Sequence, residues 1–135
     1  MEKVGFFIVG KPEQEYLEDL IFEKMRDVLT NEEIKNIAFF ENEESHDILY
    51  TFLNEEKNLY LFNLFEEYKV LIHYSDITEE VLLQNNINKN LFEGEFKILF
   101  ERFLKNNLKV DFILDKISKL GVKSLTDIDY KVLKS

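Results

Sequence analysis

Five short apolar runs in the first 74 residues have the length and composition of β-strands. They are rich in β-branched and aromatic residues, and polar segments of hairpin-loop length separate the last three. The runs are Val4–Val9, Ala38–Phe40, Ile48–Leu53, Leu59–Phe65 and Lys69–Tyr74. This pattern predicts an antiparallel sheet of four or five strands, formed by an N-terminal strand and a central meander.

Between residues 12 and 29 the apolar positions instead recur every three or four residues, which is typical of one face of an α-helix. The residues on this face are Leu17, Leu20, Ile21, Met25 and Val28. Thr30 and Glu33 then have the spacing of a capping box, which predicts that a further short helix begins there. A long N-terminal helix is therefore expected to pack on the sheet.

The chain beyond residue 74 has the pattern of three or four helices, with apolar residues at helical spacing in the segments 78–83, 92–104 and 110–120. Gly121 is suited to end a helix, and Thr126 with Asp129 can begin the last one. Strands early and helices late predict an α+β protein. We expect one domain over residues 1–135, with a helical hairpin at 109–134 as a part of it.

The segment Gly5–Lys11 has the G-x-x-x-x-G-K spacing of a nucleotide-binding P-loop. Its interior, Phe6–Val9, consists of strand-forming residues that disfavour the phosphate-binding turn. Pro12 stands where the motif has a Ser or Thr, and it lacks a backbone donor. We therefore expect a strand followed by a turn at Gly10, and no phosphate site.

Composition narrows the chemistry further. The chain has no cysteine, which excludes thiolate catalysis and cysteine-ligated metals, and its two histidines, His46 and His73, lie in no catalytic motif. We expect no catalytic residue, no metal and no cofactor. No apolar run is long enough to span a bilayer, so we expect a cytoplasmic protein that does not bind a membrane.

The charge is unevenly distributed along the chain. The net charge is −10; residues 1–90 contain 20 acids and 8 bases, whereas residues 91–135 contain 7 acids and 9 bases. The acidic character of residues 1–90 disfavours direct contact with nucleic acid, since phosphate contacts need Lys and Arg. It favours a basic protein partner.

Two acidic segments are the candidate contacts for such a partner. One is a row on the first helix, spaced every fourth residue opposite the apolar face, and the other is the connection at residues 41–47, which has four acids and no base. The predicted partner-binding residues are Glu15, Asp19, Glu23, Glu41, Glu43, Glu44 and Asp47. Solvation of the helix surface would also explain the row, because like charges at this spacing cost only a few tenths of a kcal/mol per pair.

The three central runs are apolar on both faces of the expected sheet, whereas antiparallel sheets commonly have one polar face. Two explanations remain open. Helices cover both sides of the sheet, or a homodimer forms through its aromatic-rich face.

The C-terminal segment resembles a short tail found at the soluble ends of some bacterial rhomboid-type membrane proteins, with the pattern ILDKI-xxx-G-xx-SLT-xxE-xxx-L. The matching residues are Ile113–Ile117, Gly121, Ser124–Thr126 and Leu133. Asp129 stands at the position of the usual acid, while Tyr130 and Lys131 depart from the pattern. The resemblance implies a bacterial origin and nothing catalytic.

The small size of the chain, its acidity and its shortage of candidate catalytic residues favour a non-catalytic protein-binding module, such as an inhibitor, an immunity protein or an adaptor that docks a basic partner. Two alternatives stay open. One is a nucleic-acid mimic that inhibits a nucleic-acid enzyme. The other is a carboxylate-based hydrolase, since two of the 27 acids could meet in the fold.

Overall fold

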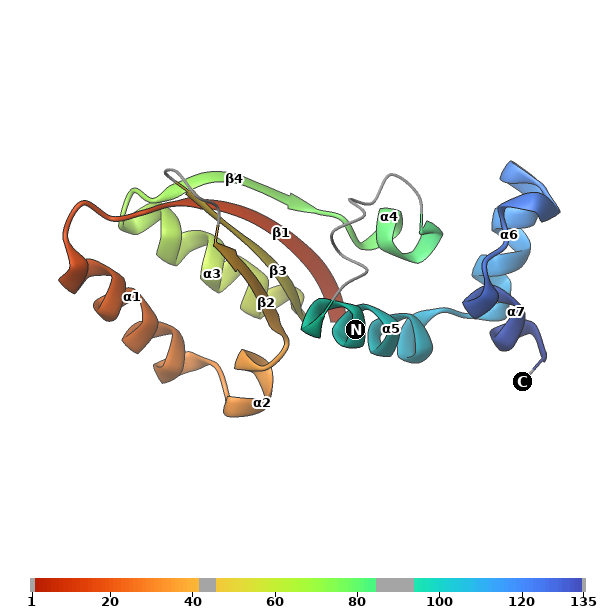
Figure 1. Ribbon diagram of the computed structural model, residues 1–135, viewed down its shortest axis with the longest axis horizontal. Helices are drawn as coiled ribbons and strands as arrows, with labels where there is room; N and C mark the ends of the chain where they lie inside the picture. The colour runs from red at the N-terminus through yellow and green to blue at the C-terminus, as the bar shows by residue number, and fades with distance from the viewer. Residues whose placement is uncertain (1, 42–45, 85–93, 135) are drawn as a thin grey trace. The chain divides into compact units, whose positions relative to one another are not determined.

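The computed structural model describes residues 2–41, 46–84 and 94–134. Within these residues the chain forms seven α-helices and one four-stranded sheet (Figure 1). It divides into an N-terminal unit, Met1–Thr78, and a C-terminal unit, Glu79–Ser135. The predicted α+β class, with an antiparallel sheet and a helical C-terminal part, is confirmed. A single domain over residues 1–135 stays a prediction.

The N-terminal unit is built on an antiparallel sheet in which the first strand is central. The strand order is β2-β3-β1-β4, with β1 at Glu2–Gly10, β2 at Ile37–Glu41, β3 at His46–Asn54 and β4 at Leu71–Asp76. Helix α1 (Glu15–Val28) follows β1, and helix α3 (Glu55–Glu67) follows β3. Apart from the short helix α2 (Asn31–Ile34) after α1, this β-α-β-β-α-β order is that of a ferredoxin-like fold, which does not by itself indicate a function.

The core of this unit lies between the two helices and one face of the sheet. Alternate residues of the central strands β1 and β3 point to that face because side chains alternate along a strand. They pack against apolar residues of α1 and α3, so that the buried core contains Phe7, Val9, Ile21, Met25, Leu29, Leu49, Leu53, Leu61, Leu64, Phe65 and Val70.

The predicted strand at Leu59–Phe65 is wrong, and so is the central meander, because this segment lies within helix α3. The side chain of Asn54 caps the helix by accepting a hydrogen bond from Lys57 N–H at 2.8 Å. Burial then follows helical spacing at Asn58, Leu61, Leu64 and Phe65. The polar segment interpreted as a hairpin loop is in fact the N-terminal turn of this helix.

The P-loop-like segment is the strand β1, as expected from its strand-forming interior. Gly10 is the last residue of the strand and donates its N–H to the carbonyl of Val70 at 2.6 Å. Extended backbone does not form the concave set of N–H groups that holds phosphates in a P-loop.

The C-terminal unit is helical. Its helices are α4 (Thr78–Leu83, which begins at the unit boundary), α5 (Glu95–Asn107), α6 (Val110–Leu120) and α7 (Asp127–Lys134), with a 3-10 turn at Val122–Ser124. Gly121 ends α6 with a φ of +84°, a conformation that favours glycine. Thr126 and Asp129 exchange hydrogen bonds at the start of α7. Both predicted boundary signals are confirmed.

The short helix α2 (Asn31–Ile34) begins with the predicted capping box. Thr30 Oγ1 accepts from Glu33 N–H at 3.1 Å, and Glu33 Oε1 accepts from Thr30 N–H at 2.9 Å. We expect Thr30→Ala to lower the free energy of unfolding by about 1 kcal/mol, measured by urea unfolding. Thr30→Ser retains the acceptor and is the control. An equal loss in both variants would contradict the capping role.

Candidate functional site

A small pocket lies between helix α1 and the β2–β3 side of the sheet, entirely within the N-terminal unit. Its volume is about 50 Å³. The apolar lining comes from α1, α3 and the ends of the strands, and it includes Val9, Ile21, Met25, Leu49, Phe65 and Val70. Two further lining residues, Phe22 and Phe39, are 42% and 45% exposed, which places them at the mouth.

Two carboxylate side chains, those of Glu18 and Asp47, also line this pocket. Glu18 is exposed on α1. Asp47 is half-buried in β3, where it lies opposite Val9 of β1 and Glu41 of β2. The pocket is therefore apolar in its interior and acidic in its polar groups.

The Oδ1 atom of Asp47 is buried, and no donor among the described residues reaches it. A buried acceptor without a hydrogen bond costs free energy, because it has lost its water and gained nothing in return. Such groups are rare in native proteins and call for an explanation, for example a ligand or ordered water. Asp47 therefore brings to the pocket lining a carboxylate whose Oδ1 has no hydrogen bond among the described residues.

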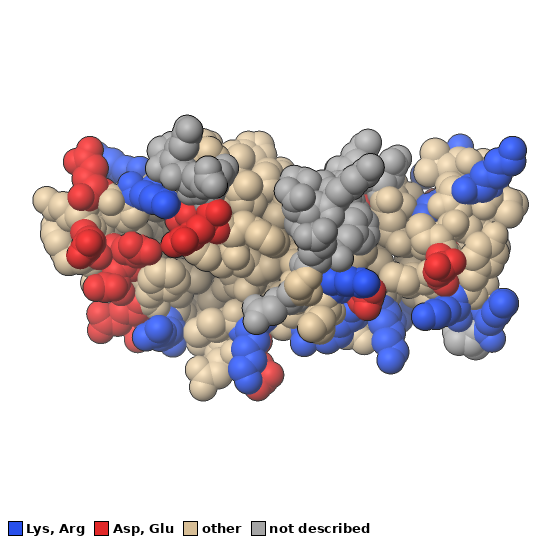
Figure 2. Space-filling model, viewed as in Figure 1, with Lys and Arg blue, Asp and Glu red and all other residues tan. Residues whose placement is uncertain are grey.

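The row predicted on the first helix is exposed as expected, at Glu15, Asp19 and Glu23. None of these carboxylates forms an ion pair within the part of the chain that the structure describes. Figure 2 shows Asp and Glu side chains gathered over α1. The N-terminal unit as a whole contains 18 acids and 7 bases.

One of the two bases of α1, Lys24, is directed away from this row. Its ammonium lies 5.4 Å from the centre of the Tyr68 ring, on the side of the helix that faces α3. A hydrogen bond to Tyr68 raises the pKa of Lys24. Tyr60 of α3 donates its hydroxyl to the Lys24 carbonyl at 2.9 Å. These contacts hold Lys24 on α3, so it does not neutralise the exposed carboxylates.

The second acidic segment is only partly described. Glu41 is exposed at the end of β2, and Asp47 belongs to strand β3 rather than to the connecting loop in which the sequence pattern placed it. Glu43 and Glu44 lie outside the described residues. The structure brings Asp47 into one pocket with Glu18 of α1, which sequence reasoning missed. Glu18 carries no local signal, since its proximity to Asp47 arises only from the packing of α1 on the sheet.

The opposite face of the sheet carries aromatic residues of β1 and β3. Tyr50 and Phe52 there are only 7% and 1% exposed, and burial raises the pKa of Tyr50. The homodimer through the sheet stays a prediction, but Leu59–Phe65 no longer supports it, because that run is helical.

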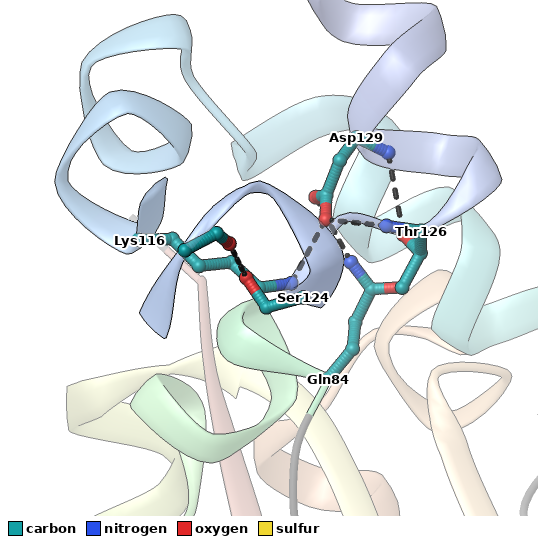
Figure 3. Close-up of polar contacts among 6 residues, drawn as sticks. Gln84, Lys116, Ser124, Thr126 and Asp129 are labelled. Carbon is teal, nitrogen blue, oxygen red and sulfur yellow. Dashed lines mark hydrogen bonds and ion pairs between the residues drawn. The ribbon is translucent and has the colours of Figure 1, made fainter. Parts of the chain in front are cut away.

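A buried ion pair lies in the C-terminal unit (Figure 3). Lys116 Nζ of α6 is 2.8 Å from Asp129 Oδ2 of α7, with side-chain exposures of 2% and 0%. Asp129 also accepts from the Gln84 amide at 3.1 Å and from Thr126 N–H at 2.9 Å. Both carboxylate oxygens are therefore satisfied and inaccessible to a substrate, so the pair joins α6 to α7 rather than forming a reactive site.

The two histidines lie on different strands of the sheet. His73 is exposed on β4, with its ring 5.7 Å from that of Phe6, and His46 begins β3. Across residues 2–41, 46–84 and 94–134, no three His, Asp or Glu side chains are placed to hold a metal ion.

Comparison with protein-family models, curated proteins and solved structures finds no match for this chain. The likeness of the C-terminal tail to rhomboid-type proteins therefore stays a prediction. Among the described helices, none has the length and apolar character needed to cross a membrane.

Proposed function

We propose that the protein is a non-catalytic cytoplasmic binding module that docks a basic protein partner, as an inhibitor, immunity protein or adaptor does. The docking site is the acidic surface of the N-terminal unit, defined as Glu15, Asp19 and Glu23 of α1 together with Glu41 and Asp47. The observation that carries the proposal is the set of exposed α1 carboxylates that form no ion pair with another described residue, next to a pocket lined by Asp47, whose buried Oδ1 has no described hydrogen-bond donor.

The physical basis is electrostatic complementarity. Exposed carboxylates attract a basic surface over a Debye length of about 8 Å at physiological salt, which speeds association and makes it salt-sensitive. Apolar contact is also available, because Tyr16 is 63% exposed on the same outward side of α1. Aromatic side chains surrounded by polar groups commonly contribute most of the binding energy at protein interfaces.

The test is a pull-down with the tagged full chain from its native cytoplasm, eluted in steps of salt and identified by mass spectrometry. We expect a stoichiometric basic protein that is released at moderate salt. The double variant Asp19→Lys/Glu23→Lys is expected to reduce its capture at least about tenfold, because it places like charges against the partner.

The matched control is Glu66→Lys/Glu67→Lys, which makes the same change in net charge at two exposed residues near the end of α3. Equal capture by the two double variants would contradict docking on the acidic surface. Capture of no basic protein would contradict the function itself. If the captured protein is a nucleic-acid enzyme that DNA or RNA displaces, the nucleic-acid mimic is the correct form of the proposal.

A further inference from the structure

We propose that the pocket beside α1 receives one lysine side chain of the partner, with its ammonium group bound by the Asp47 carboxylate. This assignment rests on the proposed docking of a basic protein and adds the residue type that is recognised. The pocket and the acidic surface share Asp47, and α1 contributes to both. A lysine inserted there would therefore occupy the same interface.

The Asp47 side chain has an unsatisfied acceptor. Asp47 Oδ1 is buried without a hydrogen bond, at a position where its carboxylate also lacks an ion-pair partner among the described residues. A lysine ammonium has three donors and no acceptor. It would supply a charge-assisted hydrogen bond to the Asp47 carboxylate, which is stronger than a bond between neutral groups. Glu18 adds a second negative charge at the pocket.

The lining of the pocket suits the stem of a lysine side chain. Ile21, Met25 and Leu49 provide apolar surface for the aliphatic stem of a lysine, which such side chains bury readily while their charged end finds polar partners. The half-exposed rings of Phe22 and Phe39 lie at the mouth. Aromatic rings attract a cation that passes near their faces.

The size of the pocket favours lysine over arginine. The volume of about 50 Å³ corresponds to roughly three or four water-sized spheres at about 15 Å³ each. That is enough for the end of an unbranched chain. Arginine has a broad planar head, which needs more room than the end of an unbranched chain.

The direct probe is n-butylammonium chloride, which has the shape of a lysine side chain. We expect it to shift the backbone amide signals of Val9, Gly10 and Leu49 in NMR spectra of the full chain, with a dissociation constant in the millimolar range. Asp47→Asn retains the shape of the side chain but removes its charge, and it should weaken this binding at least about tenfold. Asp27→Asn, at an exposed α1 residue outside the pocket lining, is the control and should leave the binding unchanged.

Three results would overturn the assignment: no shift at these amides, equal binding by the Asp47→Asn variant, or tighter binding of n-butylguanidinium than of n-butylammonium. The partner pull-down separates this proposal from the function on which it rests. If Asp47→Asn leaves capture of the partner unchanged but Asp19→Lys/Glu23→Lys abolishes it, the lysine pocket is contradicted and the docking function is retained. If n-butylammonium binds specifically but no basic protein is captured, the docking function is contradicted, and so is the assignment of the pocket to a lysine of the partner.

Discussion

Replacing Asp129 with alanine is expected to lower the free energy of unfolding by about 3–5 kcal/mol. The change leaves the Lys116 ammonium at 2% exposure without its counter-ion, and it removes the acceptor for Gln84 and Thr126. A buried charge without a partner is costly because neither water nor protein compensates it. Urea unfolding of the full chain measures the loss, and amide hydrogen exchange at residues 110–134 localises it.

A second Lys–Asp pair, which lies within helix α6, supplies the matched control. Asp115 and Lys119 are 3.5 Å apart but 67% and 70% exposed, so Asp115→Ala should cost at most about 1 kcal/mol. Replacing both buried partners, as in Lys116→Met/Asp129→Leu, should recover most of the stability lost by Asp129→Ala, because no unpaired charge remains. Similar losses for Asp129→Ala and Asp115→Ala would contradict the buried pair.

Gly5→Ala is expected to be the second large effect, with a loss of about 1–3 kcal/mol of unfolding free energy. Gly5 lies in β1 where the sheet meets α3, and a Cβ added there would be 2.5 Å from Thr51 Oγ1 and 3.1 Å from Asn58 Oδ1. Thr51 donates its hydroxyl to Asn58 in a buried hydrogen bond. The methyl group would therefore force this polar pair apart. Urea unfolding measures the effect.

A double-mutant cycle identifies the cause. Thr51→Ala removes the hydroxyl oxygen that the new Cβ would meet, so Gly5→Ala should cost less in that background than in the natural chain. Gly10→Ala is the control in the same strand, because its nearest neighbours would be 3.5 Å or more away. Additive losses in the cycle would show that the close approach of Gly5 to Thr51 is not the cause.

The parts of the fold that could be predicted are those set by neighbouring residues. Thr30 with Glu33 and Thr126 with Asp129 form reciprocal hydrogen bonds across three residues, so their spacing alone predicts a helix start. Gly121 ends a helix for an equally local reason, its positive φ. Strand β1 was predictable from the strand-forming residues that fill a P-loop-like spacing.

The wrong prediction of a strand at Leu59–Phe65 arose because local sequence does not decide the structure of this segment. A short run in which nearly every residue is apolar or aromatic has no clear period, so strand and helix cannot be distinguished from it. The helix is decided by the cap at Asn54 and by burial of Leu61, Leu64 and Phe65 against the sheet. The strand order, with β1 in the centre, likewise depends on pairing between residues far apart in the chain.

Part of the candidate site could likewise be predicted from the sequence, and part could not. The exposure of Glu15, Asp19 and Glu23 follows from helical period and was predictable, because an amphipathic helix must turn its polar side away from the core. The pocket was not predictable, since Glu18 and Asp47 are far apart in sequence and meet only where α1 packs on the sheet.

By itself, the sequence determined the α+β class, most helix boundaries and the acidic character of the N-terminal unit, because propensity, capping and charge are local properties. Only the tertiary structure decided which apolar run becomes α3, how the strands pair and which buried carboxylate oxygen has no donor among the described residues. Those outcomes depend on contacts between distant segments, whose geometry is set by packing the whole unit at once.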